Sequence, residues 1–292
     1  DFMSEWTIGI IGGSGLYAID ALEEAQWIPV QSPWGEPSDE LLCGRIGHVR
    51  VRFLPRHGRG HRIAPSTINA RANIDALKRA GCTDILAVSA VGSLSDELAP
   101  GRFVAVDQFI DNTKGRASSF FGDGFVAHVS MADPVCQRLS KHAVRSVATA
   151  GGECADGATY LAMEGPQFST RAESKLYRHW GAELIGMTGM PEAKLAREAE
   201  LPYALLAMVT DYDCWREETD AVDMAQVVEQ MQRNSKLACE VIETFCKSLP
   251  KKRTPSPIDQ ALSDAVITAP DRDDKALLAK LDAVAGRLLK SR

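Results

Sequence analysis

The chain has 292 residues, of which 45% are hydrophobic and 25% are charged. This composition is typical of a folded globular protein and argues against a disordered or fibrous one. The formal net charge of −6 disfavours a protein whose main partner is nucleic acid or an anionic membrane surface. No stretch approaches the ~20 apolar residues of a membrane helix. We therefore expect no nucleic-acid partner and no membrane partner.

The cysteines and the first residues indicate the compartment. The seven cysteines are scattered and form no CxxC pair, which favours reduced thiols over disulfides. The N-terminus lacks a basic stretch followed by an apolar one, as a secretion signal would have. Both features predict a cytoplasmic protein.

Short apolar runs rich in β-branched residues alternate with amphipathic stretches along most of the chain. We expect strands at 6–11, 49–55, 84–90, 103–110, 158–163 and 203–211. We expect helices at 71–80, 134–150, 171–180, 191–200 and 223–248, the last with Asp223 as N-cap. Strands that alternate with helices predict one α/β domain over residues 6–249, with a largely parallel or mixed central β-sheet flanked by helices.

The last part of the chain has a different composition. Residues 250–257 are rich in proline and basic residues, which is typical of a linker. Residues 258–267 and 275–289 follow as two expected amphipathic helices. We predict that residues 250–292 form a linker and a C-terminal helical tail, which either caps the domain or reaches a neighbouring subunit.

A glycine-rich loop follows the first expected strand. In Gly12-Gly-Ser-Gly15 the glycines let backbone N–H groups approach an anion, and Ser14 adds a hydroxyl donor. A plain tight turn and a dinucleotide site are the alternatives, although the acidic residue expected ~20 positions after a dinucleotide fingerprint is missing. We favour a loop that binds phosphate or substrate.

A basic loop follows the strand expected at 49–55. Arg56, His57, Arg59 and His61 lie within six residues and make a concentrated set of anion donors. The alternative is a solvated loop whose charges serve solubility. A metal site is disfavoured because no acidic ligand accompanies the histidines.

Small polar residues come at the end of the strand expected at 84–90. Ser89, Ala90 and Ser93 lie there, and a parallel sheet binds its ligands at the carboxyl ends of its strands. Taken alone, such residues serve packing more often than function. They gain weight because other strands also end in polar residues.

An aromatic residue and two acids complete the candidates. Phe168 lies on an expected exposed loop, where it could stack on a planar ring. Asp211 and Asp213 end the most apolar strand, and strand alternation directs both carboxylates to the same side. They could bind a metal, act as a general acid and an acceptor, or cap the next turn. We favour the acid and acceptor pair, because no further His or Asp cluster accompanies them.

These motifs occur together in chain order, at 12–15, 56–59, 164–173, 187–188 and 210–215. Jointly they resemble the motifs of the methylthioadenosine phosphorylases over roughly residues 6–248. The resemblance implies a single-domain, purine nucleoside phosphorylase-like α/β fold, a homotrimer, and no metal or organic cofactor. It also implies cleavage of S-methyl-5′-thioadenosine with inorganic phosphate to adenine and S-methyl-5-thioribose 1-phosphate, a step of purine and methionine salvage.

The resemblance also assigns the site residues. It places phosphate on Ser14, Arg56, His57, Ser89, the Ala90 backbone and Thr188. It places the purine on Phe168, Asp211 and Asp213, and the ribose on the backbone of Met187. It places the 5′-methylthio group on His61 and Val227, with His128 reaching over from an adjacent subunit.

The chemistry of this reaction agrees with these residue types. Breaking an N-glycosidic bond leaves positive charge on the sugar and negative charge on the base, so an anion near C1′ and a proton donor to the purine both help. Asp211 would serve N7 as general acid if burial raises its pKa, and Asp213 would accept from the exocyclic amine. Two acids favour a 6-amino purine, because a 6-oxo purine needs a donor at that position.

Three alternatives remain: a phosphorylase of methylthioinosine or of general purine nucleosides, a hydrolytic nucleosidase, and a nucleotide-binding protein without catalysis. Arg56 and the hydroxyl loops argue against the nucleosidase, because hydrolysis needs no phosphate. Gly186 and Gly189 depart from the family, whose members often carry larger residues such as asparagine there.

Overall fold

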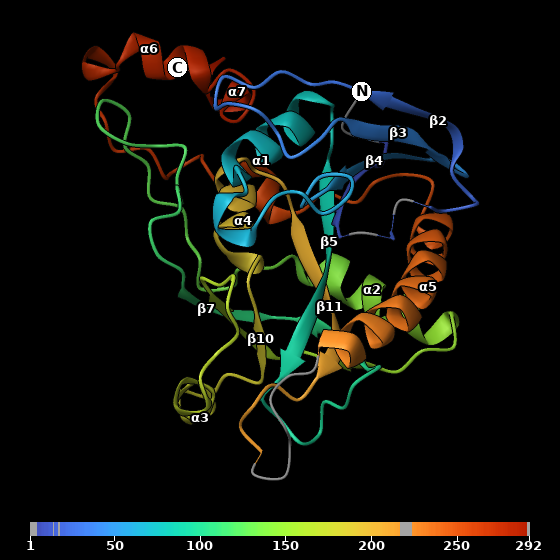
Figure 1. Ribbon diagram of the computed structural model, residues 1–292. Helices are drawn as coiled ribbons and strands as arrows, with labels where there is room; N and C mark the ends of the chain where they lie inside the picture. The colour runs from blue at the N-terminus through green and yellow to red at the C-terminus, as the bar shows by residue number, and fades with distance from the viewer. Residues whose placement is uncertain (1–4, 14, 17, 217–223, 291–292) are drawn as a thin grey trace.

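The computed structural model describes residues 5–13, 15–16, 18–216 and 224–290. Within these ranges the chain forms an eleven-stranded sheet with helices on both faces (Figure 1). Asp223, the expected N-cap of the longest helix, lies outside the described residues.

The sheet is mixed and divides at its longest strand, β5 (Asp84–Ser93). Its main path, in order of pairing, is β2 (Glu23–Ile28), β3 (Leu41–Ile46), β4 (Val49–Pro55), β1 (Thr7–Gly12), β5, β10 (Leu184–Gly186), β9 (Thr159–Met163) and β7 (Gln108–Asn112). From β5 a branch leads through β11 (Tyr203–Asp211) and β6 (Phe103–Val106) to β8 (Cys154–Asp156). Both β1 and β11 pair in parallel with β5, whereas β10 pairs with it antiparallel, which confirms the expected mixed α/β sheet.

Helices cover both faces of the sheet because alternate residues of β5 point into two cores. Ile85 and Ala87 belong to one core, together with side chains of α1 (Ala70–Arg79) and α4 (Gly189–Glu198). Leu86 and Val88 belong to the other core, together with side chains of α2 (Gln137–Thr149) and α5 (Met224–Ser248). Figure 1 shows the two helix pairs on opposite sides of β5. A strand buried on both faces is a continuous apolar run, which is why the sequence predicts it.

The apolar pattern is less informative for the other strands. It misses β2, β3, β8 and β10; β2 is mostly exposed, and β8 and β10 have three residues each. The single strand expected at 103–110 is wrong, because β6 and β7 separate at Asp107 and pair with different neighbours. The strand expected at 84–90 continues to Ser93, because β11 and β10 pair with its last residues.

The C-terminal tail is less helical than expected. Residues 258–267 hold only the end of a 3₁₀ helix, Pro257–Gln260. Residues 275–289 form two short helices, α6 (Lys275–Lys280) and α7 (Gly286–Leu289), instead of one. The first helix prediction is wrong, and the second holds only at its two ends. The tail folds against the α1 and α4 side of the domain, where its apolar residues join that core.

A buried arginine anchors the expected linker. Arg253 is 4% exposed, and its Nε lies 2.6 Å from Asp84 Oδ2 at the start of β5. Its Nη2 lies 2.7 Å from Asp259 Oδ1 in the 3₁₀ helix, and Arg138 also pairs with Asp84. These ion pairs hold the linker against the domain. The division into a domain and a tail remains a prediction.

We expect Arg253→Met to lower the free energy of unfolding by about 3–5 kcal/mol, because it leaves the buried carboxylate of Asp84 and the partly buried carboxylate of Asp259 without their shared partner. Urea unfolding followed by circular dichroism measures this change. Arg272→Met is the matched control, because Arg272 pairs with Asp271 on the surface and its loss should cost less than about 0.5 kcal/mol. Equal stability of the two variants would contradict the anchoring role of Arg253.

Candidate active site

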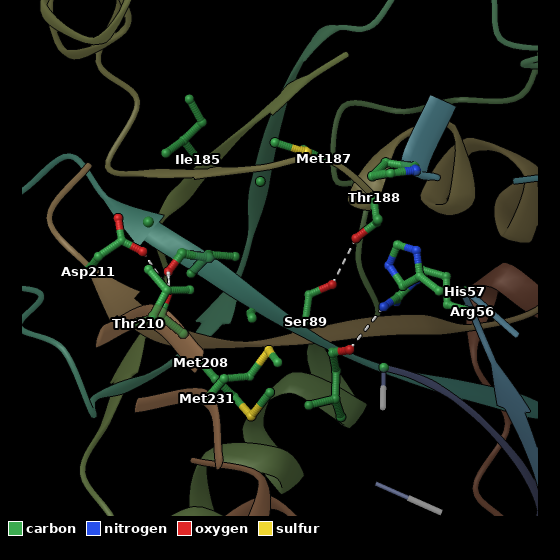
Figure 2. Close-up of a pocket in the computed structure, with 18 of the residues that line it drawn as sticks. Arg56, His57, Ser89, Ile185, Met187, Thr188, Met208, Thr210, Asp211 and Met231 are labelled. Carbon is green, nitrogen blue, oxygen red and sulfur yellow. Dashed lines mark hydrogen bonds between the residues drawn. The ribbon is translucent and has the colours of Figure 1, made fainter. Parts of the chain in front are cut away.

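A cavity of about 240 Å³ lies along the second halves of the parallel strands β5 and β11, beside the antiparallel strand β10, the start of α4 and one side of α5. Figure 2 shows its polar side chains in two groups at opposite ends. Thr188, Ser89 and His57 belong to one group and Asp211 to the other, with methionine side chains between them. The cavity thus combines two different chemistries at one edge of the sheet.

Two hydroxyl groups lie side by side at the first end. Ser89 lies within β5 and not at its end as expected, and its Oγ is 2.9 Å from Thr188 Oγ1. Thr188 immediately precedes α4. The backbone N–H groups of Thr188 and Gly189 donate to the Tyr160 hydroxyl at 3.2 and 3.3 Å. Tyr160 therefore fixes the turn that presents Thr188, and the two side-chain hydroxyls can donate to one oxyanion.

Tyr160 also accounts for the two glycines that flank Met187 and Thr188. A Cβ at Gly186 would lie 2.1 Å from the Tyr160 hydroxyl oxygen, and a Cβ at Gly189 would lie 2.9 Å from the Phe109 ring. The Tyr160 side chain is fully buried. It occupies the space that a larger residue at position 186 would need, so glycine is required there.

Arg56 at the first end is buried and paired. Its Nε and Nη2 lie 2.9 and 3.0 Å from the two carboxylate oxygens of Glu192, and its Nη1 donates to the Val88 carbonyl. Tyr203 donates to the same carboxylate at 2.8 Å. For Arg56 the solvated-loop alternative is therefore wrong. Sequence analysis missed Glu192. The feature that could have identified it is an acidic residue in a helix that is buried along most of its length.

Arg59, also expected among the anion donors, lies outside the cavity lining. It pairs with Asp39 at 2.7 Å and with Glu40 at 2.9 Å, and its guanidinium stacks on Trp27. For this residue the alternative of an exposed charge is correct.

His57 offers an acceptor to the cavity and no positive charge. Its Nδ1 lies 2.9 Å from the Ile63 carbonyl, which can only accept, so Nδ1 carries the hydrogen and Nε2 is left as an acceptor. Its ring stacks on His61 with 4.2 Å between the centroids. Burial, assisted by the charge of Arg56, lowers the pKa of His57 to about 4. The imidazole is therefore neutral near pH 7.

Two carboxyl groups lie at the other end. Asp211 ends β11, and its Oδ1 accepts from the backbone N–H of Asp213 at 2.8 Å. Asp213 has a left-handed backbone with φ 53° and lies beyond the strand, so strand alternation is the wrong reason for its position, although both side chains line the cavity. Ser174 in α3 (Arg171–His179) donates to Asp213 Oδ2 at 2.5 Å. Thr210 Oγ1 lies 2.7 Å from Asp211 Oδ2.

Both carboxyl groups hold a proton more tightly than usual. Burial raises the pKa of Asp211, against hydrogen bonds from Thr210 and the Asp213 backbone that lower it. Burial also raises the pKa of Asp213, against the hydrogen bond from Ser174 and with a contribution from the charge of Asp211. A raised pKa is what a carboxyl group needs to act as an acid near neutral pH.

Arg116, which sequence reasoning missed, fixes the segment between the two ends. Its Nη1 donates to the Met187 carbonyl at 2.6 Å and to the Met190 carbonyl at 3.0 Å. Its Nε pairs with Glu164 at 2.8 Å. The loop after β7 thereby holds the backbone of Met187 in place. A single arginine in a loop carries no sequence pattern that would reveal this contact.

The structure brings most of the predicted site residues to one cavity, which is lined by Arg56, His57, His61, Ser89, Ala90, Phe168, Met187, Thr188, Asp211, Asp213 and Val227. Ser14 lies outside the described residues. His128 lies apart, in a second pocket with Ser119 and Glu198. Over the described part of the chain, no three His, Cys, Asp or Glu side chains are grouped to hold a metal ion, and no helix is long and apolar enough to cross a bilayer.

The chain is similar in sequence and fold to known proteins. Residues 7–247 match the model of the phosphorylase superfamily. The S-methyl-5′-thioadenosine phosphorylases of Cereibacter sphaeroides and Bradyrhizobium diazoefficiens are 55% and 53% identical to it, over 97% and 99% of this chain and 98% and 100% of theirs. A crystal structure of methylthioadenosine phosphorylase from an Antarctic soil metagenomic library superposes with a TM-score of 0.89, at 46% identity over 96% of this chain and 99% of that one. Methylthioadenosine phosphorylase from Schistosoma mansoni in complex with adenine superposes with a TM-score of 0.79, at 38% identity over 83% and 91%.

The lowered pKa of His57 makes stability depend on pH. The ordinary pKa is 6.5 and the folded value is about 4, so between these values the unfolded chain binds a proton that the folded chain does not. The contribution of His57 to the free energy of unfolding therefore falls as the pH drops from 6.5 towards 4. We expect His57→Asn to remove about 2–3 kcal/mol of the destabilisation seen between about pH 7 and pH 4.5, measured by urea unfolding.

The stability of each variant must be compared with that of the wild type at each pH, because Glu198 changes the free energy of unfolding with pH in the opposite direction. Burial raises the pKa of Glu198 to about 7, so its contribution to stability falls as the pH rises from its ordinary value of 4.5 through 7. His179→Asn, at an exposed position in α3, is the matched control for the exchange itself. A pH dependence of stability that His57→Asn leaves unchanged would show that His57 is not held neutral.

Proposed function

The chain belongs to the phosphorylase superfamily and, within it, to the S-methyl-5′-thioadenosine phosphorylases, and on this premise we propose that it cleaves S-methyl-5′-thioadenosine with inorganic phosphate. The products are adenine and S-methyl-5-thioribose 1-phosphate. One observation carries the proposal: a single cavity has paired hydroxyls at one end and two carboxyl groups of raised pKa at the other. Phosphorolysis needs both ends at once, because the nucleophile and the leaving base lie on opposite sides of the sugar.

The hydroxyl end suits phosphate. Ser89 and Thr188 each offer a hydroxyl donor, and the Ala90 backbone lies beside them on the cavity wall. The buried Arg56 adds positive charge, which Glu192 partly balances. The Nε2 of His57 accepts from the hydroxyl of hydrogen phosphate. Phosphate held there stabilises the positive charge that develops at C1′ as the glycosidic bond breaks.

The carboxyl end suits a 6-aminopurine. Asp211 gives its proton to N7 as negative charge develops on the leaving base, and Asp213 accepts from the exocyclic amine. Phe168 is 46% exposed at the cavity mouth, where it stacks on the purine ring. The two carboxyl groups thus have different roles, donor and acceptor.

The wall between the two ends suits the sugar and its sulfur substituent. Arg116 fixes the backbone of Met187, which faces the ribose hydroxyls. Leu16, Val227 and Met231 line the cavity with apolar surface. A thioether needs no hydrogen-bond partner, so it suits this apolar surface better than a 5′-hydroxyl does.

We expect the protein to release adenine from S-methyl-5′-thioadenosine only when phosphate is present, followed by ultraviolet absorbance. Asp211→Asn should lower kcat/KM by roughly a hundredfold or more, because an amide has no acidic proton to give to N7. Asp96→Asn is the matched control, since Asp96 is exposed and pairs with Arg216 outside the cavity, and it should keep full activity.

Other outcomes of this assay separate the alternatives. Adenine release without phosphate indicates a hydrolase and overturns the proposal. If Asp211→Asn cleaves methylthioinosine faster than the wild type cleaves S-methyl-5′-thioadenosine, the protein is a phosphorylase for 6-oxo purines. A wild-type rate in Asp211→Asn removes Asp211 from its assigned role.

The proposal includes a homotrimer, in which His128 completes the cavity of a neighbouring subunit. In its own chain His128 lies in a separate pocket beside Glu198, so any role at this kind of site requires a second copy. The proposal also includes location in the cytoplasm, which is supported by seven cysteines with free thiols. Light scattering should give about three times the chain mass of 31.7 kDa.

We expect His128→Ala to raise KM for S-methyl-5′-thioadenosine by roughly tenfold with little change in kcat, because it removes a contact to the 5′ group. Mixed assemblies with Asp211→Asn subunits, isolated by two affinity tags, test whether the contact crosses a subunit boundary. Such assemblies contain sites with an intact Asp211 from one chain and an intact His128 from the other. Their kinetics should include a component with the wild-type KM. Assemblies that show only the raised KM contradict a site shared between subunits.

A further inference from the structure

The Thr210 hydroxyl lies between two acceptors at the carboxyl end of the cavity. Thr210 is 7% exposed and immediately precedes Asp211 in β11. Its Oγ1 lies 2.7 Å from Asp211 Oδ2 and 3.1 Å from the carbonyl oxygen of Val91 on the paired strand β5. Figure 2 shows the Thr210 side chain directed at the Asp211 carboxyl group. Both distances are those of hydrogen bonds.

The number of hydrogens decides which atom donates. A threonine hydroxyl carries one hydrogen and can also accept. The Val91 carbonyl carries none, so a hydrogen bond between Thr210 and Val91 uses the hydrogen of Thr210. The contact between Thr210 and Asp211 is then either a share of that one hydrogen, with Thr210 as donor to both acceptors, or a second hydrogen bond in which Oδ2 of Asp211 donates. Each contact has a hydrogen of its own only when Asp211 is protonated at Oδ2.

The other oxygen of Asp211 does not compete for this hydrogen. Its Oδ1 accepts from the backbone N–H of Asp213 at 2.8 Å, and that N–H group donates in either protonation state. The carboxyl group is therefore oriented with one oxygen as acceptor and the other towards Thr210. Burial, which disfavours the charged form, acts in the same direction.

We propose that Thr210 is a positioning residue that holds the acidic proton of Asp211 on Oδ2 in the free enzyme, and that turns its own hydrogen from Val91 to Asp211 once that proton has left. The inference deepens the proposed phosphorolysis and rests on it. Thr210 touches the acid and not the reacting atoms, so it acts through Asp211.

The C1′–N9 bond breaks and its electron pair goes to the purine, while an oxygen of hydrogen phosphate forms the bond to C1′. The proton of Asp211 moves to purine N7, which leaves neutral adenine and a carboxylate. Thr210 then donates to this carboxylate, and Val91 loses its hydrogen bond. Asp211 takes up a proton again for the next turnover, and the sugar phosphate monoester gives up the proton that hydrogen phosphate carried.

Replacement of Thr210 by the isosteric valine tests the inference. A hydrogen bond to a charged group is worth more than one to a neutral group, so the loss of Thr210 destabilises the Asp211 carboxylate more than the acid. In Thr210→Val we expect kcat to fall roughly ten- to hundredfold, and the pH at which kcat declines on the basic side to rise by about one unit. The measurement is adenine release at saturating nucleoside and phosphate between about pH 5 and pH 9.

Two further variants complete this experiment. Thr210→Ser keeps the hydroxyl and should restore both kcat and the wild-type position of the basic limb. Thr7→Val makes the same exchange in β1, outside the cavity, and should leave both unchanged. A lower kcat in Thr210→Val with the basic limb in its wild-type position would mean a structural role only, and it overturns the inference. Wild-type enzyme that releases no adenine with phosphate overturns the proposed function itself.

A spectroscopic measurement keeps the inference testable if Thr210→Val does not fold. The difference infrared spectrum between wild type and Asp211→Asn at about pH 7 isolates the carboxyl group of Asp211. We expect the C=O band of a protonated acid in the free enzyme, shifted in Thr210→Ser by less than in Thr210→Ala. The bands of an ionised carboxylate in wild type would overturn the inference.

Discussion

The buried ion pair between Arg56 and Glu192 is the interaction on which the cavity depends. It joins the loop after β4 to α4, and through the Val88 carbonyl it also fixes β5. An arginine that is 2% exposed stays charged and therefore needs such a partner, because breaking a buried pair typically costs about 3–5 kcal/mol. Tyr203 ties β11 to the same carboxylate. The strands and the helix that form the cavity walls therefore meet at one charged contact.

This contact changes the physical description of the hydroxyl end of the cavity. Arg56 is balanced by Glu192 and His57 is neutral, so the field there comes largely from hydroxyl and backbone dipoles held in fixed directions. Fixed dipoles stabilise a developing charge without rearranging during the reaction. The carboxyl end is organised similarly, because Ser174 and Thr210 occupy one oxygen of each carboxyl group. The chemistry at both ends is directed by neighbouring side chains that touch no reacting atom.

The residues that sequence analysis identified and those that it missed differ in a physical way. Strands buried on both faces, such as β5 and β11, and the long helix α5 carry local patterns that predict them. Loop motifs named the polar residues that line the cavity, through the resemblance more than through spacing. Glu192 and Arg116 were missed because their importance lies in partners that are far away in the chain. The prediction that Arg59 belongs to the site was wrong for the same reason, since Asp39 and Glu40 hold it outside the site.

The fit between Tyr160 and Gly186 has a consequence for how this chain can vary. A side chain at position 186 collides with the tyrosine hydroxyl, so larger residues are inaccessible there by a single exchange. They become compatible only after position 160 has become smaller, and that first change removes the acceptor for the Thr188 backbone. Positions 160, 186 and 188 are thus coupled through one side chain. The contact that orients Thr188 therefore also restricts which replacements position 186 can accept.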